Sequence, residues 1–85
     1  MKIIIADDSA VVRAILEQNL KLYSDISIIA SVSNGKRLVQ AVKKQKPDAI
    51  ISDSDMPELE GVGSLVSLAS ENDIPIIILT EDKTY

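Results

Sequence analysis

Acidic and hydroxyl side chains recur where apolar runs of the sequence end. Two acids follow the run at residues 3–6, two more lie just after the run at residues 49–51, and a threonine follows the run at residues 74–79. If these runs are parallel strands, their carboxyl ends share one edge of a sheet, where ligands collect. We therefore expect Asp7, Asp8 and Asp53 to surround one small pocket, to which the hydroxyl of Thr80 could donate a hydrogen bond.

Carboxylates that share a pocket have a chemical consequence. They repel one another, so some of them must take up protons or recruit a cation. Magnesium prefers a few carboxylate oxygens together with waters and a phosphate, and a carboxylate beside bound magnesium can attack phosphorus to give an acyl phosphate. The alternative is that Asp7 and Asp8 only cap the following helix, because acids are favoured at helix starts.

The four apolar runs that must position these groups have the features of buried strands. They are short and rich in β-branched residues, and turn-forming residues bound each of them. Their nearly continuous apolarity indicates strands that are covered on both faces. Pro75 lies at the start of the last run, where a missing N–H costs least. The runs are residues 3–6, 26–30, 49–51 and 74–79.

Segments with helical spacing separate these runs. Apolar residues recur at helical spacing in each segment, and Ser9 is placed to cap the first. The second segment follows a turn at residues 33–35, and the third follows Gly61. The alternation of strands and helices predicts a parallel sheet with helices on both faces. The apolar stripes are Val12, Ile15, Leu16 and Leu20; Leu38, Val39 and Val42; and Val62, Leu65, Val66 and Ala69.

Length and composition fit one small globular domain. The chain has 85 residues, of which 46% are hydrophobic and 26% are charged. The absence of cysteine excludes disulfides and thiolate metal sites. The net charge of −4 argues against nucleic acid as a direct ligand, and we interpret the basic run at residues 43–46 as a helix C-terminus. Without a long apolar run or a signal peptide, we expect a cytoplasmic protein with no membrane contact.

Three segments of the chain resemble, in register, the response-regulator receiver family. The first resembles the opening of the family, especially in the receivers of chemotaxis methylesterases. The second resembles the phosphoacceptor segment, and the third resembles the fourth strand with its switch hydroxyl. The segments are residues 4–10 (IIADDSA) followed by Arg13, residues 47–53 (PDAIISD) followed by Met56-Pro57 and Gly61, and residues 75–80 (PIIILT).

The resemblance implies a role for each matching polar position. Asp53 would accept a phosphoryl group from a histidine kinase. Asp8, Asp53 and the backbone carbonyl of Asp55 would hold Mg²⁺, and Asp7 would assist in the same acidic pocket. Thr80 would close onto the phosphoryl group and report the phosphorylated state. The domain would thus be a phosphoacceptor and not an enzyme, with a loop shaped by Met56-Pro57 and Gly61.

The resemblance also implies an architecture. We expect a flavodoxin-like, doubly wound α/β fold with strand order 2-1-3-4, formed by residues 1–85 as one receiver domain. The family's final helix-strand-helix is absent from these residues, so we expect an incomplete domain that switches poorly. An uncovered sheet edge would favour self-association. An output domain beyond Tyr85 would be a methylesterase, a DNA-binding domain or neither, and the sequence does not name the kinase.

The chain departs from the family around its third segment. The family usually has a small residue after the switch hydroxyl, but Glu81 stands there. Asp55 and Asp82 fall at positions that tune the lifetime of the phosphoryl group. The family's lysine after a fifth strand has no counterpart, and we do not assign its role to Lys83. The pocket should therefore need magnesium more strongly, and small phosphoryl donors should modify Asp53 slowly.

Two other functions fit parts of the pattern. A pseudo-receiver would have the same fold but bind partners without phosphorylation, which Glu81 and the missing lysine favour. The retained acids favour phosphorylation instead, and magnesium binding would discriminate between the two. The spacing of Asp53 and Asp55 also resembles the nucleophile motif of haloacid-dehalogenase-type phosphatases. That family expects a threonine or valine where this chain has Pro57, and turnover of a phosphate ester would test it.

Overall fold

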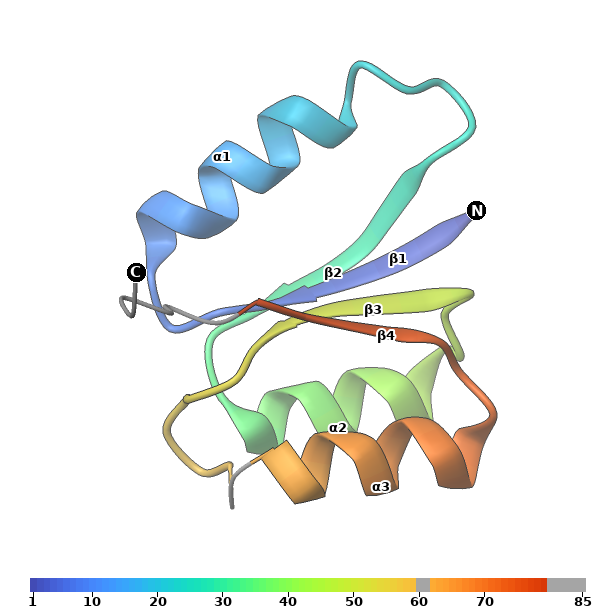
Figure 1. Cartoon of the computed structure of the whole chain (residues 1–85). Helices are drawn as coiled ribbons and strands as arrows, with labels where there is room; N and C mark the ends of the chain where they lie inside the picture. Colours follow the sequence, from blue (N-terminus) through green and yellow to red (C-terminus); the bar gives the residue numbers. More distant parts are fainter. Residues whose placement is uncertain (60–61, 80–85) are drawn as a thin grey trace, which may run out of the picture.

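The computed structural model of the chain describes residues 1–59 and 62–79, in which strands and helices alternate (Figure 1). The elements are β1 (Lys2–Ala6), α1 (Ala10–Leu20), β2 (Ser27–Val32), α2 (Gly35–Lys44), β3 (Ala49–Asp53), α3 (Val62–Asn72) and β4 (Ile76–Leu79). The strands form one parallel sheet in the order β2-β1-β3-β4. The helix α1 covers one face of this sheet, and α2 and α3 cover the other. The predicted fold class and strand order are confirmed.

The starts of the first two helices are fixed by side-chain caps. The hydroxyl of Ser9 accepts a hydrogen bond from the N–H of Val12 at 3.2 Å, as predicted. The side chain of Asn34 accepts one from the N–H of Arg37 at 2.8 Å. Lys43 and Lys44 lie in the last turn of α2, as the basic run predicted. None of the described helices combines the length and the apolarity that crossing a bilayer requires.

The strands differ from the predicted runs at their ends. The second strand extends to Val32, because Ser31 and Val32 pair with the end of β1. The third strand extends to Asp53, which pairs with Leu79 of β4. The fourth begins after Pro75, whose carbonyl accepts from the N–H of Ile50 at 3.0 Å. Backbone pairing extends β2 and β3 beyond their apolar stretches, whereas β4 is shorter than its apolar run. The polarity of the side chains does not reveal either kind of strand end.

The core lies between the sheet and the layer formed by α2 and α3. Buried side chains of the strands meet buried side chains of both helices there, and the loop after β3 contributes a methionine. Leu38, Val42, Leu65 and Ala69 are buried as the helical stripes predicted. The members of this core cluster are Ile4, Ala6, Leu38, Val42, Ile50, Met56, Leu65 and Ile74.

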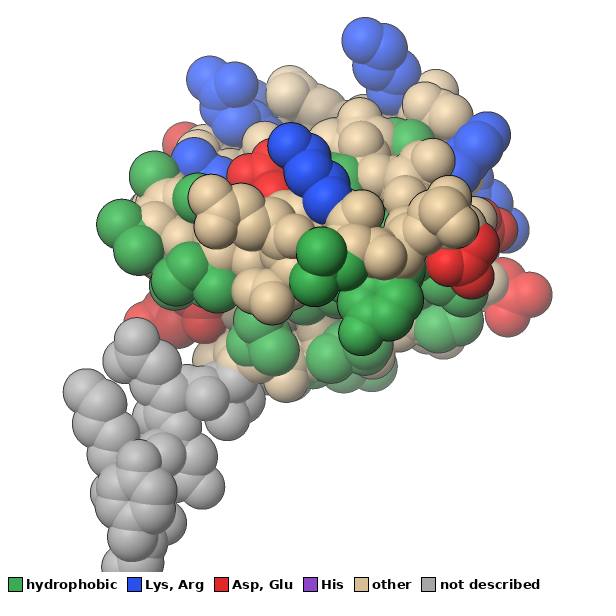
Figure 2. Space-filling view, turned by 90° about the horizontal axis from the view of Figure 1, so that it is seen from above, with side chains coloured by type: hydrophobic (Ala, Val, Ile, Leu, Met, Phe, Trp, Pro, Cys, Tyr) green, Lys and Arg blue, Asp and Glu red, His purple; other side chains and the backbone are tan. Residues whose placement is uncertain are grey.

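The opposite face of the sheet is covered only in part. The helix α1 packs over β1 and β2 and has no buried residue, so its predicted apolar stripe is only partly covered, with Ile15 53% exposed. On β4, Ile77 is 57% exposed. The prediction that every strand is covered on both faces is therefore wrong for β4. Figure 2 shows this side of the molecule, with hydrophobic side chains gathered on it.

Candidate functional site

The register of two neighbouring strands brings the predicted acids together. The strands β1 and β3 lie side by side in the sheet, and Ala6 pairs with Ser52. Asp7 and Asp53 are the next residues along each strand, so they leave the same edge of the sheet. This edge is also where the strand order reverses, because β1 has β2 on one side and β3 on the other. Ligands of open parallel sheets bind at such a reversal.

The carboxylates of Asp7, Asp8 and Asp53 form one cluster. Each contributes an oxygen, and the three oxygens lie within 4.8 Å of one another. Asp7 is buried, Asp53 is half-buried and Asp8 is exposed. The cluster is therefore open to solvent on the side of Asp8 and backed by the sheet on the side of Asp7. A ligand can reach it without a rearrangement of the core.

Asp7 and Asp8 do not serve as the cap of α1. That cap is Ser9, as described above, and the Asp7 carboxylate instead accepts a hydrogen bond from the N–H of Ser9 at 2.8 Å. Arg13 donates to the backbone carbonyl of Asp7 at 2.6 Å, which fixes the turn between β1 and α1. Asp8 has no hydrogen bond or ion pair from its side chain within residues 1–59 and 62–79. A role in helix capping therefore does not account for the presence of an acid at Asp8.

Asp53 is the carboxylate whose ionisation the site perturbs. Burial raises its pKa above the ordinary value of 3.8. The neighbouring charges of Asp7 and Asp8 raise the pKa further, whereas hydrogen bonds from the backbone N–H groups of Asp55 and Ser54 lower it. The Asp55 N–H lies 3.4 Å from the Asp53 carboxylate. A bound cation would relieve the repulsion that the other two acids impose on Asp53.

The donor set of this cluster fits a hard divalent cation. All three side chains offer carboxylate oxygens, and magnesium is held by one or two carboxylates with waters and phosphate oxygens. Among the described residues, no lysine or arginine forms an ion pair with the three acids, and Arg13 contacts only the backbone of Asp7. The negative charge of the cluster is therefore not balanced within that part of the chain.

Two contacts hold the loop after β3 in place, and the sequence did not reveal the second of them. Met56 is buried in the core cluster, so it anchors the loop rather than reacting. The N–H of Gly35, the first residue of α2, donates to the carbonyl of Pro57 at 2.9 Å. Gly35 was predicted only as part of a turn. The sequence gives no signal for its contact with a loop more than twenty residues away.

The remaining predicted site residues are less completely described. Asp55 is exposed, with its N–H directed to Asp53, and the role of its carbonyl as a metal ligand stays a prediction. Thr80, Glu81, Asp82 and Lys83 lie outside the described residues, as does Gly61. The last described residue of β4, Leu79, accepts a hydrogen bond from the N–H of Ser54 at 3.0 Å. The end of β4 therefore lies beside the segment that follows Asp53.

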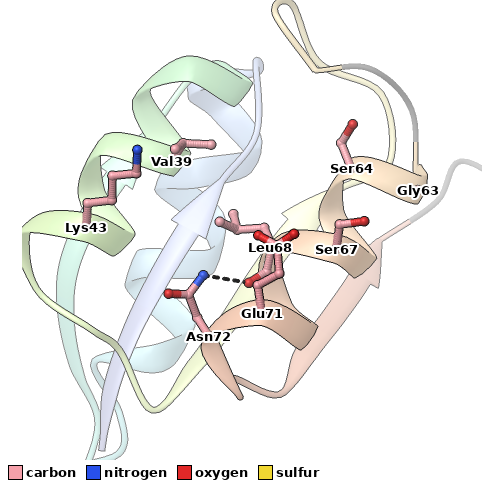
Figure 3. A pocket seen from close by; sticks show the side chains of 8 residues that line it. All are labelled: Val39, Lys43, Gly63, Ser64, Ser67, Leu68, Glu71 and Asn72. Carbon is pink, nitrogen blue, oxygen red and sulfur yellow. Dashed lines mark hydrogen bonds between the residues drawn. The ribbon is translucent and has the colours of Figure 1, made fainter.

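A separate hollow lies between α2 and α3 (Figure 3). It has a volume of about 870 Å³ and shares no lining residue with the carboxylate cluster. Lys43 lines it from α2 and Glu71 from α3, while the amide of Asn72 is occupied by a hydrogen bond of 2.8 Å to the carbonyl of Leu68. One cation and one carboxylate on opposite walls do not define a ligand, so the chemistry of this molecule centres on the strand ends.

Comparison with known proteins gives matches along nearly the whole chain. Residues 3–85 match the response regulator receiver domain family. A protein-glutamate methylesterase/protein-glutamine glutaminase of Carboxydothermus hydrogenoformans is 33% identical over 84 residues, covering 99% of this chain and 25% of that protein. A probable transcriptional regulator, ycf27, of Pyropia yezoensis is 39% identical over 79 residues, covering 93% of this chain and 32% of that protein. The chain thus spans about a quarter to a third of the length of these relatives.

Solved structures agree with this assignment. The response regulator domain of Thermotoga maritima CheB superposes with a TM-score of 0.82 at 26% identity, covering 94% of this chain and 60% of that one. The isolated REC domain of RcsB from Salmonella enterica serovar Typhimurium has a TM-score of 0.88 at 22% identity, covering 99% and 64%, and it supports the fold alone. The family match, the shared fold and the acid cluster at the strand ends show that the chain belongs to the response regulator receiver family.

Proposed function

We propose that this receiver accepts a phosphoryl group on Asp53 from a histidine kinase, in the presence of Mg²⁺. The observation that carries the proposal is the cluster in which Asp53 lies within 4.8 Å of two further carboxylates. Asp53 is the half-buried member and stands at the end of β3, next to the point where the strand order reverses. It is therefore backed by the sheet and open to an incoming group.

In the proposed reaction a carboxylate oxygen of Asp53 attacks phosphorus. The new bond joins this oxygen to phosphorus, and the bond from phosphorus to the donor nitrogen of the kinase histidine breaks, so an acyl phosphate forms. Asp8, Asp53 and the carbonyl of Asp55 would hold the metal, and Asp7 would support the same pocket. Bound magnesium supplies positive charge that offsets the acids and the transferred oxygens. Thr80 would then hydrogen-bond the phosphoryl group.

The proposed output is a change in the loops around the cluster. Phosphorylation adds a charge of about −1.5 to −2 at this site. The loop after β3 and the end of β4 lie side by side next to Asp53, since the N–H of Ser54 donates to the carbonyl of Leu79. A new charge at Asp53 would bias the arrangement of both segments, and a partner that contacts them would detect the change.

The activity of a longer protein that contains this receiver is also a proposal. The relatives include methylesterases and a probable transcriptional regulator, so an output domain beyond Tyr85 would be of one of these kinds. The receiver itself would act as the phosphoacceptor and not as an enzyme. We also propose that this reaction takes place in the cytoplasm, as expected from the sequence. The haloacid-dehalogenase alternative has no support from the comparisons, which match the receiver family along the chain.

Phosphorylation with a small donor tests this function directly. The protein is incubated with acetyl phosphate and Mg²⁺, and intact-mass spectrometry follows the adduct. We expect slow, magnesium-dependent modification that is lost in Asp53→Asn and retained in Asp25→Asn. Asp25 is an exposed acid of the loop after α1 and is not part of the cluster. A phosphoryl adduct that persists in Asp53→Asn would disprove the acceptor assignment.

The pseudo-receiver alternative predicts a different combination of results. It predicts no adduct at Asp53 with either acetyl phosphate or a phosphorylated histidine kinase. Magnesium binding without any adduct would show that the cluster has kept its metal site and lost its acceptor function. Loss of both would show that the acids are only a remnant of the family site.

A further inference from the structure

The basic residues of this acidic protein are concentrated in one stretch of the chain. Residues 26–47 contain five of its nine lysines and arginines and none of its thirteen acids. This stretch comprises β2, α2 and the turn between them. The separation of charge gives the molecule a basic edge, formed by β2 and α2, in an otherwise acidic surface. A partner with negative charge would be attracted to this edge and repelled elsewhere.

A groove on this basic edge collects three cations. It has a volume of about 420 Å³ and lies where the start of α1, the end of β2 and the outer side of α2 meet. Its polar lining comes from Arg13, Ser31, Ser33, Arg37, Gln40 and Lys44, and none of the acids that the structure describes lines it. The side chains of Arg37 and Lys44 form no ion pair or hydrogen bond with any other described residue. Their donors are therefore available to a ligand.

Arg13 links this groove to the rest of the fold. One of its guanidinium nitrogens donates to the carbonyl of Asp7, which fixes the position of the side chain. A guanidinium has five N–H donors, so the contact leaves donors that can face the groove. The cation of Arg13 is thereby pre-oriented, whereas Arg37 and Lys44 lie exposed on α2. Pre-orientation lowers the entropy lost when a carboxylate binds.

The groove runs beside an open edge of the sheet. The strand β2 is the first in the order β2-β1-β3-β4, so among the described strands it pairs with β1 alone. The carbonyl of Val32 accepts from the N–H of Asp7, the residue that follows β1, at 3.0 Å. Backbone groups alternate in direction along a parallel strand, so the neighbouring Ser31 directs its N–H and C=O away from β1. No residue of β2 is charged, although charges usually protect such an edge from pairing.

We propose that this basic edge binds an extended acidic segment of a partner polypeptide. The backbone of the segment would pair with the outward N–H and C=O of Ser31, as in binding by strand addition. Its carboxylates would contact Arg13, Arg37 and Lys44. The edge strand favours a polypeptide over a nucleic acid, because unpaired N–H and C=O groups match a peptide backbone and not a chain of phosphates.

The experiment uses a short peptide of alternating glutamate and valine, with a glutamine-for-glutamate peptide as its neutral control. Binding is measured by fluorescence anisotropy. The test variant is Arg37→Glu with Lys44→Glu, and the matched control is Lys36→Glu with Lys43→Glu. The control changes the same helix by the same charge, but neither of its residues lines the groove. We expect about tenfold weaker binding in the test variant and less than about twofold in the control.

A second measurement examines the strand edge itself. Peptide binding should slow hydrogen exchange of the Ser31 amide. Ser31→Pro should weaken binding without removing a hydrogen bond to β1, because proline is tolerated where the N–H points outward. Equal losses in both charge variants would overturn the proposal, because they would reflect net charge alone. Tighter binding of an oligonucleotide than of the peptide, with no protection at Ser31, would also overturn it. Circular dichroism checks that each variant is folded.

Discussion

The N–H of Gly35 donates to the carbonyl of Pro57 at 2.9 Å, which ties the start of α2 to the loop that follows the proposed acceptor. This loop includes Asp55, whose N–H points to Asp53, and Met56, which is buried in the core. The loop is therefore held from two sides, by a backbone hydrogen bond and by an apolar anchor. Its contacts position the carbonyl that we propose as a magnesium ligand.

Gly35→Ala should disturb this loop, because Gly35 lies against its backbone. A Cβ atom at Gly35 would lie 2.8 Å from the carbonyl carbon of Glu58 and 2.9 Å from the Cα of Leu59. Both are backbone atoms that cannot rotate away, so the loop must shift. We expect a loss of about 1–3 kcal/mol in the free energy of unfolding and weaker magnesium binding. Urea denaturation and a metal titration measure these two effects.

Gly63→Ala is the matched control for that substitution. No atom of residues 1–59 or 62–79 lies within 4 Å of a Cβ at Gly63. Alanine also has the higher helix propensity, so the stability of this variant should be equal to that of wild type or higher by up to about 1 kcal/mol. If Gly35→Ala were as stable as Gly63→Ala, the loop would not depend on the close approach to α2.

The sequence alone could predict which acids lie together in the cluster, but it could not predict the contacts that fix the loop beside them. Asp7 and Asp53 meet because parallel strands share a carboxyl edge and because Ala6 pairs with Ser52, and the first of these facts follows from the pattern of runs. The contact between Gly35 and Pro57 depends on how the β3–α3 loop folds back, which no local pattern encodes. The sequence did not predict the exposure of Ile77. An apolar run indicates that a strand can be buried, but it does not show whether a helix packs over that strand.

Removal of the Asp8 charge should abolish stabilisation by magnesium. Magnesium at ten times its dissociation constant would stabilise the folded wild-type protein by about 1.4 kcal/mol. Asp8 is exposed and makes no other described contact, so Asp8→Asn should leave the metal-free protein folded. Thermal unfolding with and without MgCl₂ should show the shift in wild type and in Asp25→Asn, and none in Asp8→Asn. If MgCl₂ raised the unfolding temperature of Asp8→Asn as much as that of wild type, Asp8 would not be a metal ligand.

The raised pKa of Asp53 makes a prediction about stability against pH. Burial raises this pKa above 3.8 in the folded protein, so the ionised carboxylate is less favourable there than in the unfolded chain. The ionised carboxylate therefore lowers the free energy of unfolding, and this destabilisation is fully present above the pKa that Asp53 has in the folded protein. It decreases as the pH falls through that pKa, and it is absent well below the pKa that Asp53 has in the unfolded chain. Without magnesium, Asp53→Asn should therefore be more stable than wild type at neutral pH, by an amount that solvent screening keeps small.

The same comparison at low pH tests the cause of that difference. Well below pH 3.8 the wild-type carboxyl is protonated in both the folded and the unfolded state, so the stabilities of wild type and Asp53→Asn should converge. Asparagine keeps the oxygen that accepts from the Asp55 N–H, so a hydrogen bond is not lost. Urea denaturation at several pH values measures the difference. If the difference in the free energy of unfolding stayed constant with pH, its cause would be side-chain packing and not the charge of Asp53.

The partly covered face of the sheet should lead to self-association. Ile77 on β4 is 57% exposed, on the side of the sheet that α1 leaves open, and exposed apolar patches favour association. Ile77→Thr should lower the sedimentation coefficient at high protein concentration, because threonine keeps the strand preference and reduces apolar area. Val66→Thr is the control, since Val66 is 51% exposed but lies on α3, across the sheet. Equal behaviour of the two variants would exclude β4 as the contact.

The end of α3 offers a stabilising substitution that tests the helix cap. Asp73 has a φ of 55°, which is a left-handed conformation that favours glycine. The N–H of Ile74 donates to the carbonyl of Ala69 at 2.9 Å, and the N–H of Asp73 donates to the carbonyl of Ser70 at 3.3 Å. These two bonds form a Schellman motif, in which glycine is the usual residue at the position of Asp73. Asp73→Gly also removes a negative charge from the negative end of the helix dipole.

We therefore expect Asp73→Gly to raise the free energy of unfolding by about 0.5–1 kcal/mol. Asp25→Gly provides the matched control, because Asp25 is an exposed loop residue without a positive φ. Glycine there only adds freedom to the unfolded chain, which should cost about 0.4–1 kcal/mol. Urea denaturation of both variants measures the free energy of unfolding, which should rise in Asp73→Gly and fall in Asp25→Gly. If both substitutions destabilised the protein equally, the left-handed cap at Asp73 would carry no strain for glycine to relieve.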